Sequence, residues 1–198
     1  MAQLLPDRLI VGLGNPGAAY ALTRHSIGFR AVDAIGAGCR IEMDTHRDGA
    51  AFGIGRICGH SVALIKPMTY MNRSGVPTGS LLTQWGLTCR EMIVIHDDMD
   101  LTFGRIKIKT KGGDGGHRGI RSLVDACGDD RFCRIRVGIG RSASDADAVD
   151  HVLGGFDEHE TAALGGIIDT VRDAAIAVLC EGAEVAMNRY NRRSSDNS

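Results

Sequence analysis

Short segments rich in Val and Ile, either apolar or alternating, recur along the chain between segments whose apolar residues follow a helical period. A period of two predicts strands, and a period near 3.6 predicts helices. The predicted strands are Arg8–Gly12, Ala51–Cys58, Ser61–Lys66, Glu91–His96, Arg105–Lys109 and Arg134–Ile139. The predicted helices are Thr23–Ala37, Ser74–Trp85, Gly119–Cys127 and Glu158–Glu181. This interleaving predicts an α/β fold in which helices cover both faces of a sheet.

Two of the predicted strands are separated only by Gly59 and His60, which is the spacing of a β-hairpin. An antiparallel hairpin within an otherwise parallel arrangement makes the twisted sheet a mixed one. The chain has 198 residues, no internal repeat and no linker-like stretch before a polar tail at about 189–198. We therefore expect residues 1–198 to form a single domain.

The composition is that of an ordinary globular protein, with 43% hydrophobic and 24% charged residues. Disorder and coiled coil are therefore excluded as overall descriptions. The longest apolar run, Ala174–Cys180, is too short to cross a bilayer, and the N-terminus does not resemble a signal peptide. The six cysteines contain no Cys-x-x-Cys pair, and a chain of this length can be stable without disulfides. These features predict a protein of the reducing cytoplasm.

The net charge of −1 excludes a uniformly basic nucleic-acid binder, but the charges are unevenly distributed. Residues 101–141 carry ten basic and four acidic residues, whereas residues 142–184 carry one basic and ten acidic residues. Arg105, Lys107 and Lys109 share one face of a predicted strand and form a basic stripe about 13 Å long. The glycine-rich loop Lys111–Gly119 follows and brings backbone N–H groups within reach of an anion. This region predicts local binding of a polyanion.

Glycine accounts for 27 residues, and three glycines lie in the motif Gly12–Gly17 directly after the first strand. The motif matches the G-x-G-x-x-G fingerprint of dinucleotide-binding enzymes, so an NAD enzyme is one hypothesis. Two features oppose it. Pro16 lacks the N–H that a phosphate cradle uses, and no strand ends in an acidic residue about 20 positions later.

In an open α/β sheet the ligand crevice lies outside the carboxyl ends of the parallel strands. Three polar residues occupy such positions after predicted strands: Asn15, Asn72 and Asp97. His25 lies near the start of the first helix, and a carboxylate such as Asp97 is suited to orient a catalytic histidine. The cluster of His96, Asp97, Asp98 and Asp100 is also compatible with a divalent metal site. A solvated acidic turn is the purely structural alternative.

Several blocks of the sequence, in order, closely resemble bacterial peptidyl-tRNA hydrolase. They are Leu9–Gly17, Tyr20 with Thr23–His25, Lys66–Asn72 with Ser74–Gly75, His96–Asp97 with Asp100–Leu101, Gly112–His117 and Arg134–Gly140. The resemblance extends from Leu9 to about Asn188. It implies a metal-free, cofactor-free monomeric esterase of the cytoplasm, without membrane attachment. The implied substrate is a peptide esterified to the 3′ end of tRNA.

The resemblance also implies a role for individual residues. His25 is the implied general base that activates water, Asp97 orients it, and Asn15 reads the blocked amide of the peptide. Asn72 places the ester and the water, and Tyr20 and Tyr70 lie where terminal bases can stack. The remaining implied tRNA-binding residues are His117, Arg118, Lys109 and Arg136, of which the last two grip the 5′ phosphate.

Two positions depart from the family pattern, which usually has Asn where this chain has Ser26 and Arg118. An arginine can donate hydrogen bonds but cannot accept them, so any acceptor role of that asparagine is lost. Arg118 can instead donate to a phosphate or to a developing oxyanion. The departure motivates a second hypothesis, a non-catalytic RNA-binding protein of the same fold, as are the plant organellar splicing factors related to these hydrolases.

Overall fold

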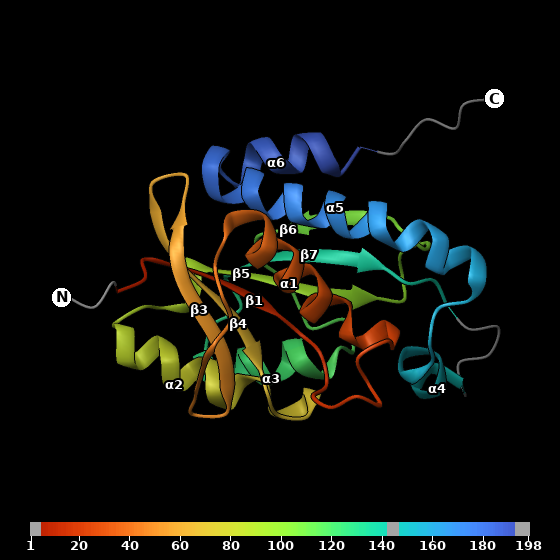
Figure 1. Ribbon diagram of the computed structural model, residues 1–198, viewed down its shortest axis with the longest axis horizontal. Coiled ribbons are helices and arrows are strands. Elements are labelled where there is room, and N and C mark those ends of the chain that lie inside the picture. The colour runs from red at the N-terminus through yellow and green to blue at the C-terminus, as the bar shows by residue number, and fades with distance from the viewer. Residues whose placement is uncertain (1–4, 142–146, 193–198) are drawn as a thin grey trace.

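A computed structural model describes residues 5–141 and 147–192 and places seven strands in one mixed, twisted sheet (Figure 1). The strand order is β2-β3-β4-β1-β5-β7-β6. The strands are β1 (Arg8–Gly12), β2 (Thr45–Arg47), β3 (Ala50–Ile57), β4 (His60–Pro67), β5 (Met92–Asp98), β6 (Ile106–Lys109) and β7 (Cys133–Gly138). Strands β4, β1, β5 and β7 are parallel, whereas β2, β3 and β6 pair with antiparallel neighbours. The predicted α/β fold is confirmed.

Helices cover both faces of the sheet, as the interleaved pattern predicts (Figure 1). Helices α1 (Ile27–Cys39), α5 (Glu158–Glu181) and α6 (Ala183–Tyr190) lie on one face, and α2 (Gly75–Trp85) and α3 (Arg118–Cys127) on the other. The short helix α4 (Ala148–Leu153) lies beyond the end of the sheet. Strand β1 is buried on both sides, because Ile10 belongs to the α1–α5 core and Leu9 and Val11 to the α2–α3 core.

Helix α1 approaches the central strands with no side chain between them. A Cβ atom on Gly12 would overlap the Gly28 carbonyl, and one on Gly28 would overlap backbone atoms of Leu13 and Ile95. A Cβ on Gly14 would lie 2.6 Å from the ring of Phe29. Gly12 and Gly14 therefore serve close helix–strand packing. No helix begins directly after the motif Gly12–Gly17, because the next helical element is the short 3₁₀ helix Arg24–Ser26, so the motif does not form the phosphate cradle of a dinucleotide site.

The structure differs from the sequence prediction at several boundaries. The hairpin turn is Cys58–Gly59, both with positive φ, so His60 belongs to β4 and pairs with Ile57. Strand β2 and helices α4 and α6 were not predicted, because three to eight residues carry little periodicity. Part of the predicted polar tail is ordered, since α6 extends to Tyr190 and Asn191 binds the backbone of Ile108. Residues 193–198 of that tail lie outside the described residues.

A disulfide joins Cys58, in the β3–β4 turn, to Cys180 near the end of α5, with the two Cα atoms 5.6 Å apart. The two cysteines are 122 residues apart and match no local motif, so the sequence did not predict the pair. The described cysteines outside this pair are free thiols. Within the described ranges, no helix is both long enough and apolar enough to span a membrane.

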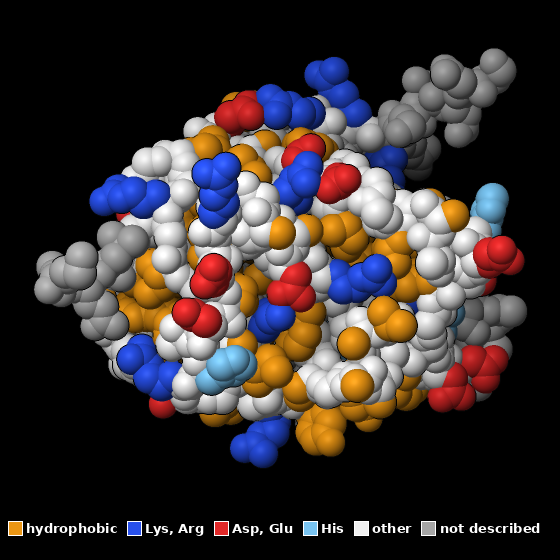
Figure 2. Space-filling model, viewed as in Figure 1, with side chains coloured by type: hydrophobic (Ala, Val, Ile, Leu, Met, Phe, Trp, Pro, Cys, Tyr) orange, Lys and Arg blue, Asp and Glu red, His pale blue; other side chains and the backbone are white. Residues whose placement is uncertain are grey.

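The face shown in Figure 2 carries Lys and Arg side chains singly, interspersed with Asp and Glu and with hydrophobic side chains. It shows no continuous basic patch over α1 and the β3–β4 hairpin. The excess positive charge of residues 101–141 instead lies on β6, the glycine loop, α3 and β7.

Candidate active site

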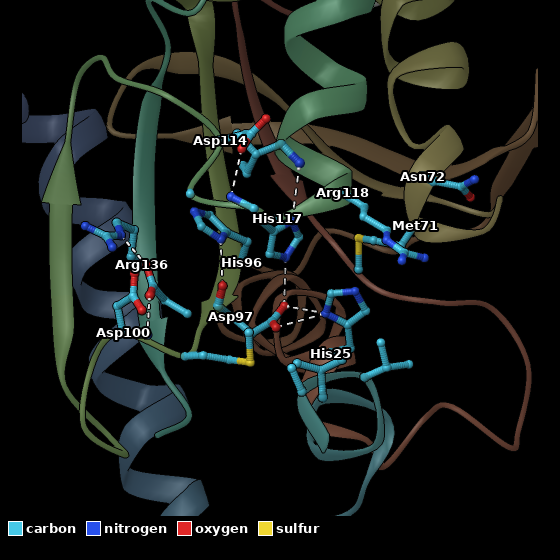
Figure 3. A pocket seen from close by; sticks show the side chains of 18 of the residues that line it. His25, Met71, Asn72, His96, Asp97, Asp100, Asp114, His117, Arg118 and Arg136 are labelled. Carbon is cyan, nitrogen blue, oxygen red and sulfur yellow. Dashed lines mark hydrogen bonds and ion pairs between the residues drawn. The ribbon is translucent and has the colours of Figure 1, made fainter. Parts of the chain in front are cut away.

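A cavity of about 550 Å³ lies where the carboxyl ends of the parallel strands meet (Figure 3). All the sequence-predicted site residues line it: Asn15, Tyr20, His25, Tyr70, Asn72, Asp97, Lys109, His117, Arg118 and Arg136. They come from the loop after β1, the 3₁₀ helix Arg24–Ser26, the 3₁₀ helix Met71–Arg73 and its N-cap, the ends of β5 and β6, the middle of β7, and the start of α3. The topology thus brings residues up to 121 positions apart around one space, as expected for the crevice of an open α/β sheet.

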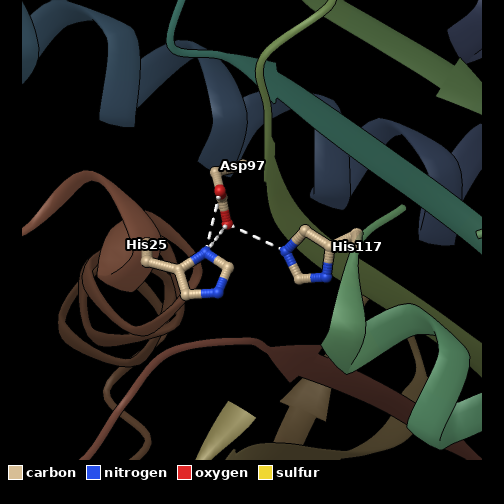
Figure 4. Close-up of side chains that lie close together, drawn as sticks. All are labelled: His25, Asp97 and His117. Carbon is tan, nitrogen blue, oxygen red and sulfur yellow. Dashed lines mark hydrogen bonds and ion pairs between the residues drawn. The ribbon is translucent and has the colours of Figure 1, made fainter. Parts of the chain in front are cut away.

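His25 and Asp97 form a hydrogen-bonded pair at the floor of the cavity (Figure 4). The Nδ1 atom of His25 lies 2.9 Å from each carboxylate oxygen of Asp97. Asp97 is 2% exposed. An ionised carboxylate accepts hydrogen bonds only, so Nδ1 of His25 carries the proton and donates it. The Nε2 atom of His25 is then left as the basic nitrogen, and within the described chain no hydrogen bond occupies it.

The pKa of Asp97 is set by opposing effects. Burial alone raises it, but the electrostatic attraction and the hydrogen bonds of the His117 and His25 rings outweigh burial and hold the pKa well below its usual range. His96 shows the reverse case, because burial first and electrostatic repulsion from the His117 ring second lower its pKa well below the usual value. At neutral pH the site therefore combines an ionised Asp97 with an uncharged His96.

Asn15 is held with a fixed side-chain orientation. Its Oδ1 accepts the backbone N–H of Met71 at 2.8 Å, so its Nδ2 is the group left to donate. The backbone N–H of Asn15 donates to Oγ of the fully buried Ser26 at 3.3 Å. Ser26, one of the two positions that depart from the family pattern, thus holds the backbone of Asn15 in place.

The aromatic and amide residues at the mouth of the cavity are more open. Tyr70 is 63% exposed, Tyr20 is half-buried, and Asn72 is exposed on the 3₁₀ helix Met71–Arg73. Figure 3 shows Asn72 at the periphery of the cavity, away from the His25–Asp97 pair. These three side chains can contact a ligand that enters the cavity without rearrangement of the core.

Basic side chains line the opposite wall. Lys109 is exposed at the end of β6, whereas Arg136 is half-buried and its Nε forms an ion pair with Asp98. Arg134, which was not predicted as a site residue, is 2% exposed and lies 4.2 Å from the ring centroid of Phe132. Its Nε and Nη1 have no hydrogen-bond partner among the described residues. Arg134 and Arg136 are two positions apart on β7, which places both side chains on the same face of the sheet.

His117 and Arg118 are neighbours with different surroundings. His117 has both ring nitrogens engaged within the protein, one of them with Asp97 at 2.9 Å. Arg118 is exposed at the first position of α3 and projects toward the part of the cavity lined by Met71 and His25 (Figure 3). Its guanidinium has neither an ion pair nor a hydrogen bond with the rest of the described chain.

The four residues of the metal hypothesis do not converge on a single point. Asp98 pairs with Arg136, Asp100 pairs with Arg141, and Nδ1 of His96 contacts the carbonyl of Asp97 at 2.7 Å. A different trio, His25, Asp97 and His117, has ligand-type atoms within 4.8 Å of one another. These atoms are already 2.9 Å apart in pairs, which is the distance of a hydrogen bond.

Sequence reasoning missed two features of the site. Val149 and Leu153 of α4 add an apolar wall, and their six-residue helix has too little periodicity to be predicted. Asp114 organises the glycine loop by accepting the N–H of Gly116 and the Nε of Arg121, each at 2.7 Å. An aspartate flanked by glycines is a sign of such a turn.

An imidazole paired with a buried carboxylate, at a cavity on a mixed α/β sheet, is an arrangement that suits a hydrolase. Comparisons with known proteins identify the family. A family model described as peptidyl-tRNA hydrolase matches residues 9–198. The chain belongs to the peptidyl-tRNA hydrolase family.

Individual relatives match over nearly their whole length. The chain is 45% identical over 184 residues to peptidyl-tRNA hydrolase of Chloroflexus aurantiacus, covering 92% of this chain and 98% of the relative. It is 41% identical over 185 residues to the enzyme of Lachnoclostridium phytofermentans, covering 93% and 97%. A crystal structure of peptidyl-tRNA hydrolase from Acinetobacter baumannii superposes with a TM-score of 0.88 at 36% identity, covering 96% of this chain and 97% of that one.

Proposed function

We propose that the protein hydrolyses the ester that joins a peptide, or another N-blocked aminoacyl group, to the 3′ end of tRNA. The observation that carries this proposal is the His25–Asp97 pair, which leaves a basic nitrogen at the cavity in a chain of the peptidyl-tRNA hydrolase family. The reaction recycles tRNA from peptidyl-tRNA that has left the ribosome.

In the proposed mechanism, Nε2 of His25 takes a proton from water while the water oxygen attacks the ester carbonyl carbon. The carbonyl oxygen becomes an oxyanion in the tetrahedral intermediate. When the intermediate collapses, the bond to the ribose oxygen breaks, and that oxygen leaves with the proton held by His25. Asp97 remains ionised throughout and stabilises the imidazolium that forms. The products are a peptide with a free carboxylate and a tRNA with a free hydroxyl.

Asn15 is assigned to the peptide side of the ester. Its Nδ2 is free to donate to a carbonyl of the substrate, because Oδ1 is bound to the backbone of Met71. Among the described residues Asn15 hydrogen-bonds to no carboxylate that could pair with a charged α-amino group, whereas a blocked amide would find a donor. This predicts a preference for N-blocked substrates.

The RNA side of the substrate is assigned to the open part of the cavity. Tyr20 and Tyr70 offer aromatic faces on which the terminal bases can stack, and Asn72 places the ester and the water. Lys109 and Arg136 are assigned to the 5′ phosphate of the tRNA, with Arg118 as an additional donor. We further propose that the enzyme acts as a monomer in the cytoplasm, without cofactor, metal ion or membrane.

The test is release of peptide from N-acetyl-aminoacyl-tRNA by wild type and by His25→Ala. We expect the variant to lose roughly 10³-fold in kcat, with tRNA affinity within about twofold of wild type. The control is His60→Ala, because His60 forms a comparable pair with Asp7 at 3.0 Å on the far hairpin. Unchanged turnover in His25→Ala would refute the mechanism.

The same assay separates the alternatives. Tight tRNA binding by wild type without any hydrolysis would support the non-catalytic RNA-binding hypothesis that Arg118 motivates. Loss of turnover in EDTA, restored by a divalent ion, would instead support metal chemistry at His25, Asp97 and His117. We expect turnover to be the same with and without chelator.

A further inference from the structure

His117 bridges the start of α3 and the buried carboxylate. As the N-cap residue of the helix, it uses Nδ1 to accept the backbone N–H groups of Gly119 and Ile120, at 3.1 and 3.3 Å. Its Nε2 lies 2.9 Å from Oδ1 of Asp97. The side chain is only 8% exposed. A helix N-terminus has unpaired N–H groups that need such acceptors, and here an imidazole supplies the cap.

These contacts determine which ring nitrogen of His117 carries a proton. A backbone N–H can only donate, so Nδ1 must present its lone pair. The proton of the neutral ring is then on Nε2, where it is donated to Asp97. Protonation of Nδ1 as well would place two donors face to face and remove the cap of α3. The helix terminus therefore selects one neutral tautomer.

Asp97 consequently receives N–H groups from two sides. Both of its oxygens face Nδ1 of His25, and Oδ1 also accepts from Nε2 of His117 (Figure 4). Both imidazole rings approach this one buried carboxylate, with their centroids 5.0 Å apart. A buried carboxylate with only one partner would be free to turn toward water, whereas this one is held from both directions.

The other titratable groups near His117 do not compete with Asp97 for its ring. His96 packs against it edge-on at 4.7 Å and is uncharged, since burial lowers its pKa well below the usual range. Asp114, in the middle of the glycine loop, is bound to Gly116 and Arg121. Asp97 is thus the only carboxylate among the described residues that hydrogen-bonds to the His117 ring.

We infer that His117 is a positioning residue for the reaction: the N-terminus of α3 fixes its tautomer, and through Asp97 it fixes the tautomer and orientation of His25. The inference gives His117 a positioning role in place of the tRNA-binding role that the family resemblance implied. Its predicted effect on turnover rests on the proposed function, but the predicted tautomers of His117 and His25 do not. The chain of contacts runs from the backbone of Gly119 and Ile120 to the basic nitrogen at the cavity.

The structural part is tested by ¹⁵N–¹H two-bond correlation spectra of ¹⁵N-histidine-labelled wild type at pH 7.5, without substrate. We expect a proton on Nε2 and none on Nδ1 for His117, and the opposite tautomer for His25. His117→Ala and His25→Asn variants assign the peaks of these two residues. A spectrum in which His117 carries its proton on Nδ1, or carries two protons, would overturn the inference whether or not the protein is a hydrolase.

The kinetic part compares His117→Asn with His117→Ala. Asparagine is a good N-cap but is too short to donate to Asp97, so it separates capping from positioning. We expect His117→Asn to keep a Tm within about 2 °C of wild type, to lose 10- to 100-fold in kcat with KM within twofold, and to shift the acid limb of the kcat/KM profile. His117→Ala should show the same kinetic loss and a lower Tm.

Wild-type kcat and an unchanged pH profile in His117→Asn would show that His117 only caps the helix, and would overturn the inference. If His117→Asn unfolds, the spectrum of wild type still decides the tautomer. Failure of wild type to hydrolyse N-acetyl-aminoacyl-tRNA would refute the proposed function while leaving the tautomer result intact.

Discussion

The two sides of the cavity differ in how their polar groups are satisfied. On the catalytic side, Asp97 is 2% exposed and is bound by two imidazoles. On the basic side, Lys109 and Arg118 are exposed and lack partners in the described chain. The groups assigned to chemistry are thus positioned before any ligand arrives. Of the groups assigned to RNA, Lys109 and Arg118 are unpaired in the described chain, whereas Arg136 is half-buried and already paired with Asp98.

This difference has an energetic reason. A buried carboxylate that lost its donors would pay a large desolvation cost, so its geometry is held strongly. An exposed lysine gains little from a fixed partner, and its interactions are screened within about 8–10 Å at ordinary ionic strength. Substitutions on the two sides should therefore differ in size, in kinetic signature and in their response to salt.

The largest expected effect in this comparison is that of Asp97→Asn. An amide in place of the carboxylate permits the wrong tautomer of His25, so we expect kcat to fall by about 10²- to 10⁴-fold with little change in KM. Steady-state kinetics on N-acetyl-aminoacyl-tRNA measure this. An increase in KM with unchanged kcat would show that Asp97 does not support the chemical step.

Asp97 should also give a pH-dependent stability. Because its folded-state pKa lies below the usual value near 3.9, its ionisation stabilises the fold fully above about pH 4. That contribution is lost as the pH falls through the lower, folded-state pKa. Urea denaturation between pH 7 and pH 2.5 should show wild type losing more stability than Asp97→Asn. Parallel stability curves for the two proteins would contradict this.

On the basic side, Lys109→Ala and Arg136→Ala should each raise KM by roughly 5- to 10-fold with kcat nearly unchanged. The dependence of log KM on log salt concentration should flatten, since fewer counterions are released on binding. Arg56→Ala is the matched control, because Arg56 is exposed on the far hairpin. An equal effect in the control would mean that only overall charge matters.

A smaller effect is expected from Arg118→Asn, which restores the usual residue of the family. The unpaired guanidinium can donate to a phosphate or to the oxyanion, so we expect a two- to fivefold change in kcat/KM. Comparing blocked and unblocked aminoacyl-tRNA at two salt concentrations separates the two roles. A change in kcat that persists at high salt would indicate that Arg118 donates to the oxyanion rather than to a phosphate.

The smallest expected effect on activity is that of Cys58→Ser, since the disulfide lies far from the cavity. The bridge closes a loop of 122 residues, so its removal from the oxidised protein should lower stability by up to about 5 kcal/mol. Thermal denaturation with and without reductant measures this, while kcat stays at the wild-type value. Equal Tm values in both conditions would show that the bridge does not form.

The alternating elements of the sheet and the long helices could be predicted from periodicity alone. The positions of Asn15, Asn72 and Asp97 after strands also predicted where the cavity lies. The sequence could not predict that His117 contacts Asp97, because a residue after a glycine loop has no periodic constraint on its direction. The apolar wall of α4 and the contact between Cys58 and Cys180 depend on tertiary packing between distant segments.

The contact between Gly28 and the backbones of Leu13 and Ile95 has an evolutionary consequence. Helix α1 follows directly from the turn that holds His25, and Ile95 lies two residues before Asp97 on β5. Because main chain rests on main chain there, substitutions among the surrounding core side chains can accumulate without altering the distance between base and carboxylate. The spacing of His25 and Asp97 thus depends on backbone contact, and a single alanine at position 28 would disturb it more than many exchanges in the core.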